Sequence, residues 1–262
     1  MTTGALIFAY NNDAFDYVRM AAWSAANIRR HLGIPVAVVT DKPTKLDFDK
    51  VIVHECRAPD SRWFGDIQQR AAWNNQSRPD AFDLSPWDRT LLMDADYVVA
   101  SDRLKLLVNQ KHAFLCHRWA RDATGQNDFR GLNFFGRFNM PMYWATVIVF
   151  DRCQHTRLIF DCMKMIRQHW THYKNIYQDR SKTYRNDHAL SIALNVANGH
   201  GNAIDHIPWD LISVMPEHGL QALSPDRYRV DFIRTDNRPA WIELQDQDFH
   251  AMGKQSLMSM IS

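Results

Sequence analysis

The sequence predicts one α/β domain, and its N-terminal segment carries the clearest evidence. The apolar run GALIFAY (residues 4–10) ends in the polar triplet NND, as a buried parallel strand ends in a loop. Residues 14–32 then place apolar side chains at helical spacing until Gly33, and IPVAVVTD (34–41) has the composition of a second strand. Strand, helix and strand in this order predict a right-handed β-α-β unit with parallel strands.

The later segments continue the alternation of strands and helices. Further strands are predicted at KVIVH (50–54), RTLLMDAD (89–96), HAFLCHRW (112–119) and MYWATVIVF (142–150). Further helices are predicted at 66–76, 103–109, 155–170 and 186–198, and in the third of these Leu158, Cys162, Ile166 and Trp170 would share one face. Residues 119–141 and 171–185 are predicted to be long loops, and short strands and turns follow residue 198. No repeat or Pro/Gly/Ser-rich linker divides residues 1–262, which are therefore expected to form a single domain.

The composition favours a soluble intracellular protein. Hydrophobic residues make up 46% of the chain and aromatic residues 12%, which is sufficient for a well-buried core. The four cysteines form no C-x-x-C pair and show no zinc-site spacing, so reduced thiols in a cytoplasmic protein are expected. The N-terminus lacks the basic region of a signal peptide, and no apolar stretch approaches the length of a membrane span.

Two aspartates one residue apart follow an apolar strand in LLMDADYVVASD (91–102). Side chains at positions i and i+2 of a strand point to the same side, so Asp94 and Asp96 would lie close together. Two carboxylates at that spacing repel each other unless they share a proton or a cation, and hard divalent cations prefer oxygen ligands. The motif therefore points to a metal site, while the alternative is an Asp-rich turn whose side chains cap backbone amides.

The segment AYNND ends the first strand, where open α/β sheets bind ligands. We expect it to contact the base or ribose of a nucleotide through Ala9, Tyr10, Asn11, Asn12 and Asp13. Asp13 has a second possible role, which is to cap the helix that follows. The β-α-β unit lacks G-x-G-x-x-G, so another group has to neutralise the phosphates. The chain also lacks G-x-S-x-G, a Walker lysine motif and H-E-x-x-H, and His250, four residues before Lys254, is the histidine that its context singles out.

These elements together resemble the GT-A glycosyltransferases, in particular the glycogenin-like family 8. The resemblance implies a Rossmann-like mixed sheet flanked by helices, with residues 1–110 as the nucleotide-binding half and 111–262 as the acceptor-facing half. It implies that Mn²⁺ or Mg²⁺ binds to Asp94, Asp96 and His250, with Ala95 in the same donor-binding element. Lys254 would contact the diphosphate of a UDP-sugar, Arg78 would add positive charge, and Asp187 with Asn186 would lie beside the transferred sugar as the catalytic element.

The sequence departs from the family pattern in two places. YWATVIVF replaces the family's N-x-G strand, and the last motif lacks the usual K-P-W ending. The family implies transfer of a hexose or pentose with retention of the anomeric configuration. The chain is also similar to short phage-encoded members, some of which look like DNA-modifying sugar transferases.

A nucleic-acid acceptor is the leading hypothesis for the second substrate. Residues 164–185 contain six Lys/Arg against one Asp, interleaved with Trp170, Tyr173, Tyr177 and Tyr184. Basic residues neutralise phosphates and aromatic rings stack on exposed bases, so this stretch and 118–137 are predicted to contact DNA, with a hydroxymethylated pyrimidine of phage DNA as the acceptor. The alternatives are a protein or saccharide acceptor, a sugar nucleotidyltransferase, and a non-catalytic nucleic-acid-binding module.

Overall fold

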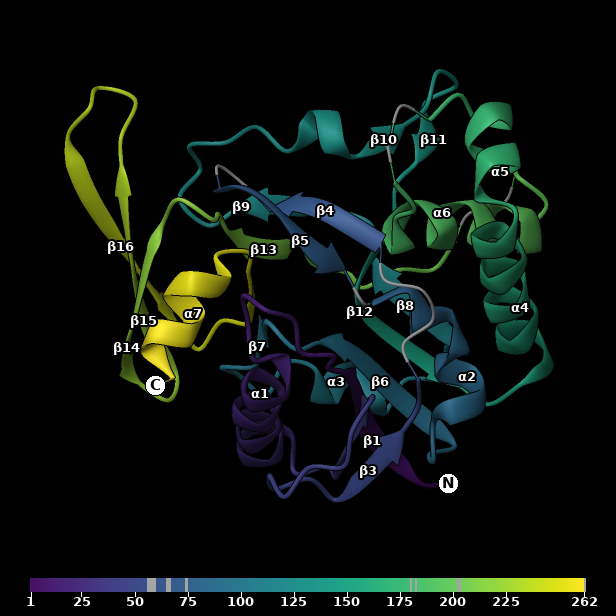
Figure 1. The fold of residues 1–262 in the computed structure, drawn as a ribbon, viewed down its shortest axis with the longest axis horizontal. Helices are drawn as coiled ribbons and strands as arrows, with labels where there is room; N and C mark the ends of the chain where they lie inside the picture. The colour runs from purple at the N-terminus through teal and green to yellow at the C-terminus, as the bar shows by residue number, and fades with distance from the viewer. Residues whose placement is uncertain are drawn as a thin grey trace.

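A six-stranded mixed sheet forms the centre of the computed structural model, in the order β3-β2-β1-β6-β12-β8 (Figure 1). Its strands are β1 (Thr3–Phe8), β2 (Val36–Thr40), β3 (Lys50–Val53), β6 (Arg89–Asp94), β8 (Phe114–His117) and β12 (Trp144–Asp151). β1, β2, β3 and β6 run parallel, whereas β12 is antiparallel to both of its neighbours. The predicted α/β class with a mixed sheet is confirmed. The structure describes residues 1–55, 60–64, 67–73, 75–179, 181, 183–201 and 204–261.

Helices cover both faces of this sheet. α1 (Tyr17–Leu32) packs on one face with α3 (Lys105–Val108), and the other face is covered by α2 (Ala81–Leu84), α4 (Gln154–Gln168) and α6 (Asn186–Ala197). α5 (Trp170–Ile176) follows α4 directly. Alternate residues of one strand serve the two cores, since Ile7 packs on the α1 side and Leu6 on the α4 side. Strands buried on both faces have continuous apolar sequences, which is why the segments that form β1 and β2 were recognisable.

Two smaller sheets extend the molecule beyond the central one. The first consists of β7 (Tyr97–Val98), β17 (Phe249–Ala251), β13 (Leu211–Val214) and β9 (Ala120–Asp122), in that order. The second consists of β14 (Gly219–Ser224), β15 (Arg227–Ile233) and β16 (Pro239–Gln245). It lies with α7 (Lys254–Met260) at the opposite side of the molecule from α4, α5 and α6 (Figure 1). The β7–β17 pairing brings the last part of the chain against the residues that follow β6.

The prediction of a helix at 66–76 is wrong. Ile67–Trp73 forms strand β5, which pairs antiparallel with β4 (Asp60–Phe64), and the 3₁₀ helix η1 (Asn75–Asp80) follows. Residues 66 and 74 lie outside the described part of the chain. Strand formation here depends on a partner strand, and pairing of this kind outweighs local propensity. Pro79, which has no amide proton, accompanies the tighter 3₁₀ turn.

Three further features of the helices differ from the predictions. α1 begins at Tyr17 because the side chain of Asp16 caps it, accepting a hydrogen bond from the Arg19 amide at 2.9 Å, so Asp13 is not the cap. The buried face of α4 is displaced by one residue from the predicted one: Leu158 is exposed, whereas Ile159, Cys162, Met163 and Ile166 are buried. Trp170 begins α5, so residues 171–176 of the predicted 171–185 loop are helical.

The predicted loop at 119–141 contains short regular elements. Besides β9 these are η2 (Arg130–Leu132), β10 (Phe134–Phe135) and β11 (Met140–Pro141), and the last two pair as a small hairpin.

The structure also describes three of the four cysteines and the lengths of the helices. Cys116, Cys153 and Cys162 are free thiols, and Cys56 falls outside the described residues. None of the helices in the described ranges is long and apolar enough to cross a bilayer.

Candidate active site

A cavity of about 230 Å³ opens at the carboxyl ends of β1 and β6. The chain builds the sheet outward from β1 to β2 and β3 and then crosses to place β6 on the other side of β1. Such a topological switch point leaves a crevice between neighbouring loops, where α/β proteins bind ligands. Phe8 and Tyr10 reach the cavity from the end of β1, and Asp94, Ala95 and Asp96 reach it from the end of β6.

The two aspartates have different environments. Asp94 ends β6 and forms an ion pair of 2.7 Å with Arg78, whose side chain is only 1% exposed. The other end of the Arg78 guanidinium donates hydrogen bonds to the carbonyl oxygens of Ala145 and, at 3.2 Å, Thr146. Arg78 therefore ties η1 to both β6 and β12 and holds Asp94 in place. Asp96 lies in the turn after β6 and is buried.

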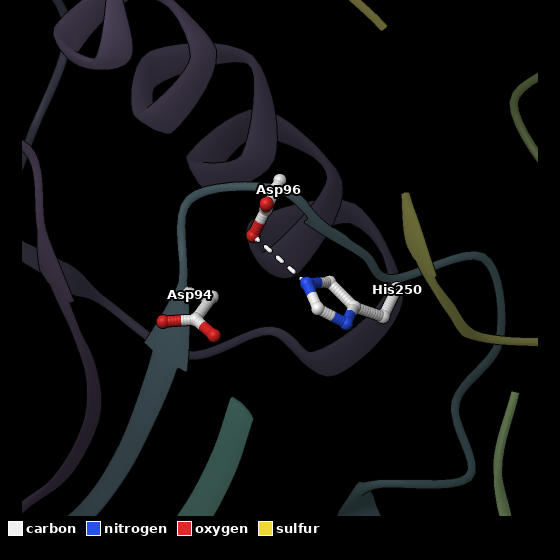
Figure 2. Close-up of side chains that lie close together, drawn as sticks. All are labelled: Asp94, Asp96 and His250. Atoms are coloured by element: carbon white, nitrogen blue, oxygen red, sulfur yellow. Dashed lines mark ion pairs between the residues drawn. The ribbon is translucent and has the colours of Figure 1, made fainter. Parts of the chain in front are cut away.

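Strand pairing brings His250 to the aspartates from a distant part of the sequence. On β17, His250 lies opposite Tyr97 of β7, and the Ala251 amide donates a hydrogen bond of 2.9 Å to the Asp96 carbonyl. The His250 ring points at Asp96, with 3.5 Å between its Nε2 and Oδ1 of the carboxylate (Figure 2). Lys254, at the start of α7, forms an ion pair with the other carboxylate oxygen of Asp96.

Asp248 anchors the segment that carries His250. Its Oδ1 accepts hydrogen bonds from the Ala100 amide (2.8 Å), the Ser101 amide (2.9 Å) and the Ser101 hydroxyl (3.0 Å). Sequence reasoning did not identify this role. Its only signal was an aspartate two residues before the singled-out histidine, and its partners depend on how the chain folds back.

The donor set fits a divalent metal ion. One ligand atom each from Asp94, Asp96 and His250 lies within 4.8 Å of the others. Ligands at about 2.1 Å from an octahedral ion lie about 3 Å apart when adjacent and about 4.2 Å apart when opposite, so only small movements would bring these atoms into coordination. Two hard carboxylates with one imidazole suit Mn²⁺ or Mg²⁺.

The environments of the two carboxylates shift their acidities in opposite directions. Burial raises the pKa of Asp94, and the repulsion of Asp96 adds to this despite the opposing effect of Arg78. Burial also acts to raise the pKa of Asp96, but the nearby Lys254 and His250 outweigh it, so that pKa lies well below its ordinary value. Asp96 is therefore the stronger acid of the pair.

Asp187 and Asn186 form a second polar wall of the cavity, at the start of α6. The Asp187 carboxylate accepts a hydrogen bond of 2.9 Å from the Ala145 amide and lies 3.5 Å from the Arg185 guanidinium. The Asn186 amide nitrogen donates to the Asn75 carbonyl oxygen at 2.9 Å. The side-chain oxygens of Asn186 and Asn75 are buried and have no hydrogen-bond partner among the described residues. These oxygens can accept hydrogen bonds from a bound ligand.

The AYNND segment divides between cavity and scaffold. Tyr10 lines the cavity, whereas Ala9 is buried in the core. The side-chain oxygen of Asn11 accepts from the Val18 amide (2.9 Å), and that of Asn12 accepts from the Phe15 amide (2.8 Å), so both shape the loop before α1. Asp13 is exposed and does not line the cavity.

Several cavity residues were not predicted from the sequence. They are Phe8, Tyr17, Asn75, Trp144, Ala145, Thr146, Arg185 and Met252. Trp144 and Thr146 open β12, which runs antiparallel to β6 and so begins at the edge where β6 ends. The direction of this strand could not be read from its apolar composition. Arg185, directly before the predicted Asn186 and Asp187, had the clearer signal, since basic residues suit a phosphate-binding wall.

The basic stretch 164–185 is only partly available to a nucleic acid. Lys164 forms an ion pair with Asp83, and Arg167 lies 3.3 Å from Asp80. Tyr184 is buried and packs edge-to-face on Trp170, with 5.5 Å between the ring centroids. Tyr173 and Tyr177 pack against the same core, and Arg180 and Lys182 lie outside the described residues.

Comparison with known proteins shows only distant similarity. The sequence matches no protein-family model and no curated protein sequence. The apo form of the glycosyltransferase GlyE of Streptococcus pneumoniae TIGR4 is 13% identical with a TM-score of 0.43, over 79% of this chain and 45% of GlyE. This chain thus spans less than half of the length of GlyE.

Two other solved structures are similar at the same level. The galactosyltransferase LgtC, in complex with donor and acceptor sugar analogs, is 10% identical with a TM-score of 0.48, over 72% of this chain and 70% of that one. The 2-C-methyl-D-erythritol 4-phosphate cytidylyltransferase of Thermus thermophilus is 11% identical with a TM-score of 0.38, over 79% and 88% of the two chains. These values are too low to transfer an activity, so the chemistry has to come from the side chains of the cavity.

Proposed function

We propose that this protein is a metal-dependent glycosyltransferase of the GT-A type that uses a nucleotide-diphosphate sugar, with a UDP-sugar as the leading donor. The observation that carries the proposal is the convergence of Asp94, Asp96 and His250 on one cavity wall, within 4.8 Å of one another. Arg78 and Lys254 lie beside this cluster, and Asp187 lines the same cavity. We place the protein with the glycogenin-like family 8, near its phage-encoded members, because the order of these residues along the chain resembles that family.

Donor binding divides among residues with different chemistry. Asp94, Asp96 and His250 would hold Mn²⁺ or Mg²⁺, which when bound neutralises the diphosphate that leaves the sugar. Lys254 adds a mobile ammonium group at the same place, because its partner Asp96 would turn to the metal. Tyr10 supplies an aromatic surface and a hydroxyl for the base or ribose. The donor diphosphate would thus lie along the β6–β17 side of the cavity.

The sugar would lie against α6. The Asp187 carboxylate and the Asn186 side-chain oxygen accept hydrogen bonds from sugar hydroxyls and orient the anomeric carbon. In the reaction the bond from this carbon to the diphosphate oxygen breaks, and a bond to an acceptor hydroxyl oxygen forms as that hydroxyl loses its proton. We propose retention of configuration, on the resemblance to family 8.

The acceptor that we propose is a hydroxymethylated pyrimidine in phage DNA. Its hydroxymethyl group supplies the nucleophilic oxygen, and arginines of the 118–137 region supply positive charge for the phosphates. Arg137 is exposed in this region and has no acidic partner among the described residues, which supports a polyanionic partner, whereas Arg130 pairs with Asp128 at 3.0 Å. A protein or saccharide acceptor would need the same donor site and no such charge.

Calorimetry with UDP-sugars, with and without Mn²⁺, tests the donor side. We expect binding that requires Mn²⁺ and slow release of free UDP in the presence of water or an acceptor. A sugar nucleotidyltransferase would instead bind a nucleoside triphosphate. When a sugar phosphate is added as the second substrate, it would release pyrophosphate. A non-catalytic binding module would show no metal-dependent nucleotide binding, and that result would rule out the transferase.

A further inference from the structure

Aromatic side chains are exposed along the segment from Trp119 to Phe138. Trp119 is 41% exposed, Phe134 is 45% exposed and Phe138 is 67% exposed. Large apolar groups normally lie inside a protein, and a cluster of exposed ones marks a binding surface. The aromatic residues of the 164–185 stretch pack against the protein core instead, so they are poorly placed to stack on a partner.

One buried arginine fixes the positions of two of these rings. The Arg118 guanidinium lies 4.2 Å from the ring centroid of Trp119 and 5.1 Å from that of Phe134. It also donates hydrogen bonds to the backbone carbonyls of Asn133 (2.9 Å) and Met142 (3.0 Å). The Trp119 and Phe134 rings, called the aromatic platform below, are therefore held in place while each keeps an exposed side. A rigid exposed ring loses little conformational entropy when a flat ligand stacks on it.

The residues that hold the aromatic platform are close neighbours, in the chain and in the sheet, of one wall of the donor cavity. Met142, held by Arg118, lies two residues before Trp144, which lines the cavity at the start of β12. His117, next to Arg118, pairs with Trp144 across β8 and β12. The start of β12 thus relates the position of the platform to that of the cavity wall at Trp144.

In the described ranges, cationic side chains without an acidic partner occur in the segment of the aromatic platform and on the neighbouring helix α5. Arg137 is exposed in the same segment and has no acidic partner within 4.0 Å among the described residues, whereas Arg121 lies 3.7 Å from Asp210. The β10–β11 hairpin packs on the end of α5, where the position of Gly136 lies against the Tyr177 carbonyl. Lys174 of α5, which likewise has no acidic partner in the described part of the chain, belongs to the same side of the molecule. Exposed rings combined with cationic side chains are the usual features of a single-strand nucleic-acid surface.

We propose that the aromatic platform stacks on unpaired bases of a nucleic-acid acceptor strand. Trp119 and Phe134 would each take one base, and Arg137 and Lys174 would lie near the backbone phosphates. This inference rests on the proposed function, since it names the side chains that would bind the nucleic-acid acceptor of the same transferase. It moves the stacking role from the tyrosines of 164–185 to two rings within the 118–137 region.

The test is fluorescence anisotropy of a labelled short oligothymidylate at low salt, with the full chain. Trp119→Ala and Phe134→Ala should each weaken binding about tenfold, because stacking on one base contributes roughly that factor. Trp119→Phe should keep most of the affinity. Trp241→Ala is the matched control, because Trp241 is an exposed tryptophan (57%) on β16, in the β14-β15-β16 sheet. The Trp241→Ala variant should bind oligothymidylate as the wild type does.

Three outcomes would overturn the proposal. The first is that the wild type does not bind oligothymidylate at low salt. The second is that Trp241→Ala weakens binding as much as the platform variants do. The third is that the platform variants lose affinity for a saccharide but keep their affinity for oligothymidylate. Calorimetry of donor and Mn²⁺ on the same variants separates this proposal from the proposed function. Failure of the wild type to bind any donor would remove the transferase, while ring-dependent oligothymidylate binding would still support the platform.

Discussion

At the scale of single residues, each aspartate of the D-x-D motif has a basic partner of its own. Arg78 pairs with Asp94, and Lys254 pairs with Asp96. From the sequence alone, two adjacent carboxylates were expected to repel each other unless a metal intervened. Side chains from η1 and α7 offset part of that repulsion, so the motif carries its own counter-charges.

Asp96→Asn should abolish Mn²⁺-dependent UDP binding and should also lower the stability of the metal-free protein. The amide cannot neutralise Lys254, whose ammonium group would be left poorly paired in a largely buried place. Loss of a hydrogen bond to a charged group of this kind costs about 1.5–3 kcal/mol. Urea denaturation in chelator gives the stability change, and calorimetry gives the nucleotide affinity.

Asp151→Asn is the matched control for this variant. Asp151 pairs with Arg89 at 2.5 Å, at the opposite end of β6 from the cavity. The Asp151→Asn variant should lose about as much unfolding free energy as Asp96→Asn and should keep metal-dependent UDP binding. A variant at Asp96 that bound UDP and Mn²⁺ normally would contradict the assignment of this residue as a metal ligand.

At the scale of elements, the sequence predicted the parts whose signal is local. β1, α1, β2, β6 and α6 have periodic or continuous apolar patterns that need no partner to be recognised. The β4–β5 hairpin was not predicted, because its residues suggest a helix and only the pairing of the two strands favours the β-structure. In the site, Asp94, Asp96 and His250 were found by motif order, whereas Asp248 depends on the pairing of β17 with β7, which is a tertiary event.

Gly136→Ala should separate the β10–β11 hairpin from α5. Gly136 has a φ of 67°, and a Cβ there would lie 2.2 Å from the Tyr177 carbonyl oxygen. The added methyl group therefore meets both backbone strain and a backbone clash, with an expected loss of about 2 kcal/mol of stability. Hydrogen exchange should show faster exchange of the hairpin amides.

Gly131→Ala provides the comparison within the same segment. A Cβ at Gly131 meets no atom within 4 Å, and its φ is not positive. This variant should exchange like the wild type. Equal protection of the hairpin in both variants would show that the hairpin does not depend on the close approach at Gly136.

At the scale of the whole molecule, the candidate metal site joins segments that are far apart in the chain. Asp94 and Asp96 follow the central sheet, and His250 belongs to the small sheet beside it. Any ligand that bridges them binds the folded state alone and so stabilises it. Mn²⁺ and UDP together, at about a hundredfold excess over their dissociation constant, should raise the Tm by about 5–10 °C.

His250→Ala should lose most of this rise. His206→Ala is the control, because His206 is exposed and its ring contacts the Ile204 carbonyl of its own loop. Differential scanning fluorimetry with Mn²⁺ alone, UDP alone and both together measures the effect. The same rise in His250→Ala as in the wild type would exclude the histidine from the site.

The ion pairs of the cavity also determine what can enter it. Its lining contains the acidic Asp94, Asp96 and Asp187 and the basic Arg78, Arg185 and Lys254, so the formal charges of these side chains cancel. A free diphosphate or a bare divalent cation would each leave an unbalanced charge among these partly buried side chains. A diphosphate that has already bound its cation is nearly neutral and disturbs that balance least. The cavity should therefore discriminate by net charge and admit the donor and its metal as one complex, in preference to either of them separately.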